Sequence, residues 1–304
     1  MRILVTGASG LVGSALVPAL AEEGHTVLRL VRHTPGPGEV CWAPDAGSLD
    51  AAALEGLDAV IHLAGESLNG RWTAARKARI RESRAQGTRL LSRTLAGLQH
   101  PPDTLISVSA IGYYGDRGDE VLREENPPGK GFLAEVCQEW EAATQPAADR
   151  GIRVVIPRLG MILSREGGAL AEMLLPFRLG VGGPLGSGKQ WMSWITRDDV
   201  VGVMRHLLET TSLSGPVNAT APQPVTNAEF TRILGRVLLR PTLFRVPAVA
   251  LRLAFGELAD AALLGSQRVQ PARLLATGYA FLYPNLEGAL RHVLRRPRVS
   301  RAGG

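Results

Sequence analysis

The chain begins MRILVTGASGLVG, and this stretch from Met1 to Gly13 decides its fold. Three apolar residues, Ile3 to Val5, predict a short buried strand. Glycines follow with the spacing G-x-x-G-x-x-G, at Gly7, Gly10 and Gly13. From Leu11 onward, apolar side chains recur at helical spacing until Gly24. A strand, a glycine-rich turn and a helix in direct succession are typical of a unit that binds a dinucleotide.

The start of this predicted helix is the expected place for the diphosphate. Unpaired backbone N–H groups and the positive end of the helix dipole favour an anion there. The glycines provide a tight turn, a close approach of backbone to ligand, and close packing of helix on strand. The predicted cofactor contacts in this turn are Gly7, Ser9, Gly10, Leu11, Val12 and Gly13.

The end of the second predicted strand, 27–31, distinguishes the two nicotinamide cofactors. A carboxylate at this place holds the ribose 2′-hydroxyl of NAD. This chain has Arg32 there and offers no Asp or Glu. Because arginine makes charge-assisted hydrogen bonds to phosphate, the sequence predicts NADP(H) in preference to NAD(H).

The remaining pattern predicts an α/β fold with a doubly wound parallel sheet of the Rossmann type. Continuous apolar strands are expected at 59–64, 105–109 and 154–156, with helical segments near 71–97 and 131–149. Beyond residue 160, glycine and proline crowd the sequence and short helices dominate. We therefore expect a dinucleotide-binding domain at 1–160, to which later segments can return, and a smaller carboxy-terminal α/β lobe at 161–304. We expect the arginine-rich tail 291–304 to fray.

Composition excludes a disordered chain, a fibrous repeat and a small disulfide scaffold. The 304 residues are 45% hydrophobic and 20% charged, which is ordinary for a globular protein with a sizeable core. Because no long apolar run and no secretory signal is visible, we expect a cytoplasmic protein without a membrane partner. The net charge of +6 comes from scattered arginines, so no nucleic-acid partner is expected. Cys41 and Cys137 form no CxxC pair, and both are predicted to be reduced and buried.

Further motifs resemble the extended short-chain dehydrogenase/reductases, the group that contains sugar-nucleotide epimerases and dehydratases. More narrowly, the chain is similar to a subfamily of epimerase-like proteins with a carboxy-terminal domain of unknown function. The stretches that carry the resemblance are 62–66 (HLAGE), 109–115 (SAIGYYG), 182–188 (GGPLGSG), 191–195 (WMSWI), 267–271 (QRVQP) and 278–279 (GY).

The resemblance implies an oxidoreductase or epimerase that acts on a small, sugar-like or anionic molecule. It also implies a homodimer formed through the helices near 71–97 and 131–149. It places further cofactor contacts along the strand ends, at Leu63, Ala64, Gly65, Glu66 and Ser107.

Typical members of the group use a serine and a Tyr-x-x-x-Lys pair, whose lysine lowers the phenol pKa and binds the nicotinamide ribose. This chain lacks the pair, because the residues four positions before its three lysines are Thr73, Asn126 and Leu185. If Glu141 matches the glutamate that ends the family helix, Leu133 takes the place of the tyrosine and Cys137 that of the lysine. Neither side chain can perform the missing role.

Three interpretations stay open. Ser109 keeps the serine position, and Tyr113 or Tyr114 could supply a phenol that is assisted by the positive field of Arg117 or Arg158. Alternatively, an acid or base could come from one of three other side chains, namely Glu66, Glu135 or Cys137. Finally, the protein could bind NADP(H) without turnover and act as a redox or metabolite sensor.

Other motifs carry weaker signals. The stretch 180–194 combines clustered glycines with Lys189, Trp191 and Trp194, so it is either a substrate-facing surface or a glycine loop packed under core tryptophans. His62 is expected in the core. Asp198 and Asp199 have no neighbouring ligand residues in the sequence, so no metal is predicted.

Overall fold

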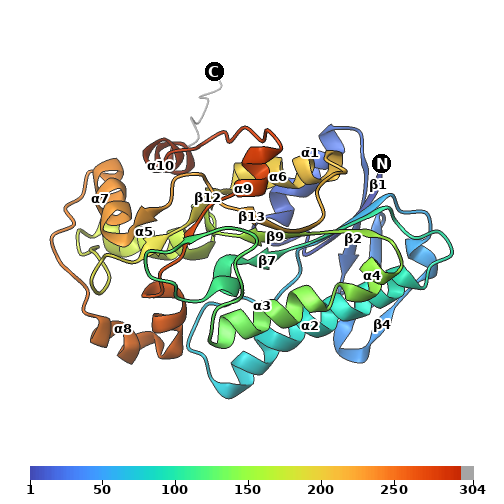
Figure 1. Cartoon of the computed structure of the whole chain (residues 1–304), viewed down its shortest axis with the longest axis horizontal. Helices are drawn as coiled ribbons and strands as arrows, with labels where there is room; N and C mark the ends of the chain where they lie inside the picture. The colour runs from blue at the N-terminus through green and yellow to red at the C-terminus, as the bar shows by residue number, and fades with distance from the viewer. Residues whose placement is uncertain (296–304) are drawn as a thin grey trace, which may run out of the picture.

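The computed structural model describes residues 1–295 and is built around one extended β-sheet (Figure 1). The strands lie in the order β13-β9-β6-β5-β1-β2-β3-β4, and every neighbouring pair except β3 and β4 is parallel. The predicted doubly wound parallel sheet is therefore confirmed. The strands are β1 (Arg2–Thr6), β2 (Thr26–Val31), β3 (Glu39–Ala43), β4 (Ser48–Leu49), β5 (Ala59–His62), β6 (Thr104–Ser107), β9 (Arg153–Leu159) and β13 (Gly215–Ala219), and β7 (Ser109–Ala110) also pairs with β9.

The order of the strands reverses at β1, which places the binding crevice. The chain adds β2 and β3 on one side of β1, and β5, β6, β9 and β13 on the other. Thr6 at the end of β1 stands in register with Leu30 of β2 and with His62 of β5. In open sheets of this kind, ligands bind outside the carboxyl ends of the strands at such a reversal.

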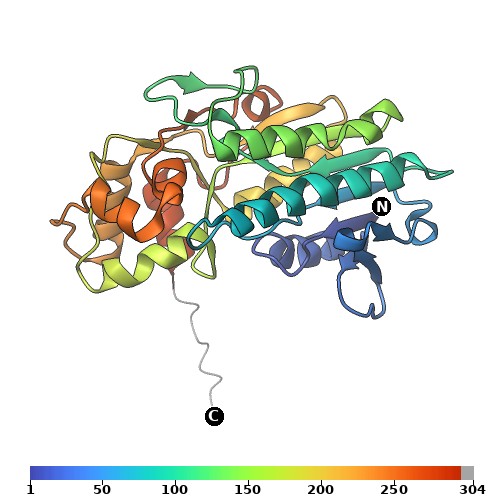
Figure 2. The same ribbon diagram turned by 90° about the horizontal axis from the view of Figure 1, so that it is seen from below.

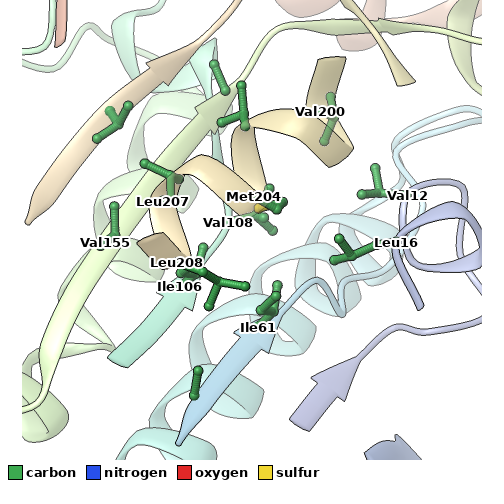
Figure 3. Packing of buried hydrophobic residues seen from close by; sticks show 14 of the residues in the cluster. Val12, Leu16, Ile61, Ile106, Val108, Val155, Val200, Met204, Leu207 and Leu208 are labelled. Atoms are coloured by element: carbon green, nitrogen blue, oxygen red, sulfur yellow. The ribbon is translucent and has the colours of Figure 1, made fainter. Parts of the chain in front are cut away.

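Alternate residues of each strand pack against helices on opposite faces of the sheet, as continuous apolar strands require. On one face, Ile3 and Val5 join a buried cluster with α1 (Gly13–Glu22) and α6 (Arg197–Glu209). Figure 3 shows Met204 of α6 beside the sheet residue Val108, and Leu207 of the same helix on the side of Val155.

The opposite face is covered by α2 (Ala74–Ala96), α3 (Phe132–Ala142) and the short α4 (Gln145–Asp149). There Leu4 joins a second buried cluster with Leu91 and Leu95 of α2. Figure 2 shows α2 and α3 running side by side across this face. The single helix predicted at 131–149 is divided in two. Pro146 stands in the first turn of α4, where its missing N–H costs nothing.

A second lobe packs beside the sheet (Figures 1 and 2). Its core gathers apolar residues of three helices around the buried Trp194 and Phe230. Its elements are β10 (Met161–Leu163), α5 (Gly168–Arg178), β11 (Trp191–Met192), β12 (Trp194–Thr196), β14 (Val225–Thr226), α7 (Asn227–Leu238), α8 (Ala248–Phe255) and α10 (Leu286–Leu294). The short α9 (Ala272–Ala276) instead packs on β13, and its Leu274 belongs to the core cluster of the sheet. Another short pairing joins β8 (Val121–Leu122) to β15 (Arg268–Val269).

The chain crosses between the two parts more than once. Although β13 and α6 come after residue 160, they complete the sheet and one of its helical layers. A division of the chain into two domains at residue 160 therefore stays a proposal, to which β13, α6 and α9 are exceptions. None of the helices in residues 1–295 is both long and apolar enough to span a bilayer.

Two expectations from the sequence are wrong. Cys41 is exposed, because the two-residue period of β3 turns Val40 and Trp42 inward and Cys41 outward. The tail from residue 291 was expected to fray, but it is helical up to Leu294, because α10 continues through these residues and buries Leu290. The rest of that tail, residues 296–304, lies outside the described residues.

We predict that Leu207→Ala lowers the free energy of unfolding by about 2 to 5 kcal/mol, because a fully buried side chain between α6 and the sheet would leave a cavity. Urea unfolding followed by circular dichroism measures this change. Leu253→Ala is the control, since that side chain on α8 is 77% exposed and should change stability by less than about 0.5 kcal/mol. Equal losses in the two variants would contradict the assigned core.

Candidate cofactor and active site

The glycine turn after β1 leaves no room for side chains. Gly7 has a φ of 65°, and a Cβ there would stand 2.9 Å from the carbonyl carbon of Leu63. A Cβ at Gly13 would stand 2.3 Å from the oxygen of Gly7. Both distances are shorter than carbon atoms tolerate, so only glycine brings α1 this close to the end of β1.

The amino end of α1 is open to an anion. Within the described chain, the backbone amides of Leu11, Val12 and Gly13 have no hydrogen-bond acceptor. The helix also lacks a capping side chain and an acidic residue in its first turn. Ser9 and Gly10 are exposed beside these amides. The cradle therefore fits the diphosphate of a dinucleotide, which would satisfy N–H groups that the protein leaves free.

A buried network fixes the next part of the crevice, the segment after β5. The Oγ1 atom of Thr6 accepts hydrogen bonds from the amides of Leu63 and Ala64, both at 3.1 Å. The hydroxyl of Thr6 therefore donates its own hydrogen bond to Nδ1 of His62 at 2.7 Å. The ring then carries its proton on Nε2, which donates to Oγ1 of Thr88 at 2.9 Å. Burial lowers the pKa of His62 to about 4, so the ring is neutral at physiological pH. The sequence expectation that His62 belongs to the core is met by its complete burial.

The other predicted cofactor residues lie at the same edge of the sheet. Ser107 ends β6 in register with His62, and its buried Oγ has no partner among the described residues. Gly65 and Glu66 follow Ala64 in the loop between β5 and α2. Arg32 is exposed immediately after β2, on the far side of β1. These positions suit a cofactor that crosses the carboxyl end of β1.

The predicted catalytic residues belong to one hydrogen-bond network centred on Arg158 of β9. Its guanidinium makes two bonds of 2.8 Å to the carboxylate of Glu141 on α3. The hydroxyl of Ser109 donates to the same carboxylate at 2.8 Å. Burial lowers the pKa of Arg158, but hydrogen bonding and charge interaction with Glu141 more than offset this effect and raise it overall. Such a bidentate pair is rigid, because both planar groups are held in one orientation.

The two tyrosines have different surroundings. Tyr114 is completely buried, and its hydroxyl donates to Asn218 at 2.7 Å while accepting from Arg158 at 2.9 Å. Burial raises the pKa of Tyr114 to about 12, although Arg158 acts in the opposite direction. Tyr113 is only half-buried, its hydroxyl has no partner among the described residues, and the Arg158 guanidinium lies 3.5 Å from the centre of its ring. Tyr113 is thus the phenol that a substrate can reach.

The other acid–base candidates are less suited to proton transfer. Cys137 is buried, and burial together with the charge of Glu141 raises the pKa of its thiol to about 11. Glu135 is exposed and forms an ion pair with Arg81 at 3.0 Å. Glu66 faces Arg76 at 3.5 Å. Arg117 is bound to Glu120, so the positive field near the tyrosines comes from Arg158.

Leu133 and Cys137 line α3 next to the segment that carries the tyrosines, η3 (Ile111–Tyr114). A Cβ at Gly112 would stand 3.3 Å from the Cβ of Leu133 and 3.8 Å from the sulfur of Cys137. Tyr113, the next residue, is therefore close to the part of α3 where the sequence lacks the Tyr-x-x-x-Lys pair.

The stretch 180–194 is packed into the protein. A Cβ at Gly183 would collide with the carbonyl oxygen of Phe244, and the amides of Gly186 and Gly188 donate to other backbone carbonyls. Trp194 is fully buried, which agrees with the alternative of a glycine loop packed under core tryptophans and excludes a substrate-facing role for this side chain. Trp191 is half-buried, with Arg268 over its ring at 4.3 Å and Asp119 accepting its indole N–H at 2.8 Å. The glycines here serve close packing.

The aspartates after this stretch are committed to structure. Asp199 accepts hydrogen bonds from the amides of Leu282 and Tyr283, and Asp198 binds His292. Within residues 1–295, no three His, Cys, Asp or Glu side chains gather in a way that could hold a metal ion.

Sequence reasoning missed two members of the network around Arg158, namely Asn218 and Glu124, whose carbonyl oxygen accepts from Arg158 at 3.3 Å. Asn218 stands on β13, 104 positions after Tyr114, and no local motif connects the two. Only the pairing of β13 with β9 brings Asn218 beside Arg158, with which it is in register.

The parallel sheet, the open glycine cradle and the crevice at β1 define an NAD(P)-binding protein with the fold of the extended short-chain dehydrogenase/reductases. A family model described as "NAD dependent epimerase/dehydratase family" matches residues 3–219. Another, described as "Domain of unknown function (DUF1731)", matches residues 246–293. The chain belongs to the NAD dependent epimerase/dehydratase family, which confirms the resemblance seen in the sequence.

Individual relatives cover nearly the whole chain. Epimerase family protein Mb2239 of Mycobacterium bovis is 45% identical over 297 residues, which are 97% of this chain and 98% of that protein. Human epimerase family protein SDR39U1 is 38% identical over 298 residues, which are 97% of this chain and 100% of that protein. The crystal structure of human SDR39U1 (isoform 2) with NADPH matches with a TM-score of 0.89 and covers 96% of this chain and 99% of that chain.

We predict that the His62 ring does not titrate between pH 5 and 8, because burial holds its pKa at about 4. The unfolded chain binds a proton near pH 6.5, so stability from this group is complete above pH 6.5 and is lost as the pH falls toward 4, by up to about 3 kcal/mol. The carbon chemical shift of the ring followed by NMR measures the titration. A midpoint near 6.5 for His62 would contradict the buried network.

Proposed function

We propose that this protein is an NADP(H)-dependent oxidoreductase or epimerase that acts on a small, sugar-like or anionic molecule, with Tyr113 as its acid–base residue. The observation that carries the proposal is the open cradle at Leu11, Val12 and Gly13, with Arg32 placed at the end of β2. The crystal structure of human SDR39U1 with NADPH, a relative of 38% identity, supports the choice of cofactor.

In this proposal the cradle amides bind the diphosphate, and Arg32 binds the 2′-phosphate at the adenosine end. When bound, the nicotinamide ring accepts or supplies a hydride. Tyr113 takes a proton from the substrate hydroxyl or returns one to the substrate carbonyl at its phenol oxygen. Arg158 lies against the face of the Tyr113 ring, 3.5 Å from its centre, and holds the ring in place.

Ser109 and Glu141 are assigned a positioning role. Glu141 is bound by both Arg158 and Ser109, so these contacts fix the guanidinium that supports Tyr113. Tyr114 holds the same guanidinium from the opposite side through its hydroxyl. The arrangement therefore gives the two neighbouring phenols different tasks, one structural and one chemical.

A second function is supported by the same network. The hydroxyl of Ser109 is buried and is already hydrogen-bonded to Glu141. Leu133 and Cys137, at the places of the missing Tyr-x-x-x-Lys pair, provide neither a proton nor a cation. A protein that binds NADP(H) and reports its redox state without turnover would have these features. We further propose a cytoplasmic location and a homodimer formed through α2 and α3, which lie side by side on one face (Figure 2).

We predict that Arg32→Ala weakens NADPH binding about 10- to 100-fold and leaves NADH binding within roughly twofold, because only NADPH carries the 2′-phosphate. Fluorescence titration of each reduced cofactor measures this. Arg29→Ala is the matched control, because Arg29 lies on β2, shortly before Arg32, and pairs with Glu39. Equal affinity of the wild type for both cofactors, with no effect of Arg32→Ala, would refute the preference.

We predict that Tyr113→Phe lowers the rate of NADPH oxidation about 10²- to 10⁴-fold without changing NADPH affinity, since it removes the proton donor. The assay is single-turnover oxidation of bound NADPH against a panel of small carbonyl compounds and nucleotide-linked keto sugars. Tyr114→Phe should retain most of the rate and lose about 1 to 3 kcal/mol of stability, because it leaves the buried groups of Arg158 and Asn218 unpaired.

The same assay separates enzyme from sensor. Turnover that survives in Tyr113→Phe and fails in Tyr114→Phe would reverse the assignment of the two phenols. Tight NADPH binding by the wild type, with no oxidation by any compound of the panel, would favour the sensor.

A further inference from the structure

One cation that the sequence did not single out lies in the wall of the crevice. Arg84 projects from α2 between the loop after β5 and helix α3. A Cβ at Gly65 would stand 3.4 Å from the central carbon of the guanidinium, and the ring of Trp140 is centred 5.0 Å from that carbon. Burial lowers the pKa of Arg84, while the charges of Cys137 and Glu66 act in the opposite direction.

The hydrogen bonds of Arg84 use only part of its guanidinium. Nη1 donates to the backbone oxygens of Glu66 at 2.9 Å and Ile80 at 3.2 Å, and these two bonds use both of its hydrogens. Among residues 1–295, neither Nη2 nor Nε of Arg84 has an acceptor. The loop that carries Gly65 is thus held by one edge of the guanidinium, and the other edge is free.

Unlike Arg76 and Arg81, the other two half-buried arginines of α2, Arg84 has no carboxylate partner among the described residues. Arg76 faces the carboxylate of Glu66 at 3.5 Å, and Arg81 pairs with Glu135 and Glu139. A partly buried charge without a counter-charge is costly unless a polar or anionic group meets it. The free N–H groups of Arg84 reach the surface, so a polar or anionic group of a ligand can meet them there.

Sheet topology indicates which part of the cofactor would be met there. The diphosphate cradle is at β1, and Arg32 follows β2 on one side of it. A dinucleotide with its adenosine end at Arg32 extends its other half over β5 and β6, on the opposite side of β1. Arg84, behind Gly65 and near Cys137, is on that side.

We propose that Arg84 donates its free N–H groups to the ribose-phosphate of the nicotinamide half of NADP(H). This inference rests on the proposed function, because it requires that the crevice binds this cofactor. It gives the nicotinamide half of the site the positive charge that neither Leu133 nor Cys137 supplies. It also links the ligand to the loop at Gly65, since the same guanidinium holds both.

The test compares two ligands, NADPH and adenosine 2′,5′-bisphosphate, which has the adenosine end and lacks the nicotinamide half. Arg84→Gln should weaken NADPH binding about 10- to 100-fold and change bisphosphate binding by less than about twofold. Arg32→Ala should weaken both ligands. Isothermal titration measures the affinity of the wild type and of each variant for both ligands, and it needs no substrate.

Arg76→Gln is the matched control. Arg76 lies on the same helix and donates to the same loop, at the backbone oxygen of Ser67, from the solvent side. It should leave both affinities within about twofold of the wild type. A loss of NADPH affinity as large as that of Arg84→Gln would show that the loop alone is responsible, and would overturn the proposal.

Two further results would also overturn it, namely an unchanged affinity of Arg84→Gln for NADPH, or an equal loss for both ligands. If Arg84→Gln does not fold by circular dichroism, Arg84→Lys carries the test, because it keeps the charge and loses the planar fork. It should weaken NADPH alone, and an unchanged affinity would overturn the proposal. A wild type that binds neither ligand would instead refute the proposed function.

Discussion

The contact of backbone on backbone at Gly7 and Gly13 is the constraint on which the rest of the structure depends. A Cβ on Gly13 would stand 2.3 Å from the oxygen of Gly7, so no other residue brings α1 so near the end of β1. This approach aims the free amides of α1 at the crevice. It also lets the loop after β5 pack against Gly7, where Thr6 holds it through the amides of Leu63 and Ala64. One steric restriction therefore produces both the anion cradle and the neighbouring wall.

The ion pair of Arg158 and Glu141 organises the opposite half of the site. A buried pair of this kind is costly unless its remaining groups are satisfied. Here Ser109, Tyr114 and the ring of Tyr113 provide those contacts from one stretch of the chain, the motif 109–115. The family to which the chain belongs contains enzymes, but the serine and one of the tyrosines are used here to hold an arginine. In the function we propose, the chemistry at the crevice thus depends on what Tyr113 and Arg84 can reach.

Much of the fold could be predicted from the sequence, because continuous apolar strands and a glycine turn report on local backbone geometry. The strand at 39–43 was not foreseen, since it alternates apolar and polar residues next to glycine and proline. The burial of Cys41 was predicted wrongly for the same reason. In the site, the turn at 7–13 was identified from its glycine spacing together with the strand before it and the helix after it. Tyr113 and Tyr114 could not be told apart, because adjacent residues share every sequence signal.

The sequence by itself determined the parallel sheet, the glycine cradle, the family and the absence of the Tyr-x-x-x-Lys pair. Each of these features depends on residues that are close to one another along the chain. Only the tertiary structure decided that Tyr114 is buried against Asn218, that Trp194 belongs to the core, and that Arg84 keeps one edge of its guanidinium free. Such features depend on contacts between distant segments. Burial and hydrogen-bond partners set the chemical character of a side chain, and these are known only once the sheet and its helices have packed.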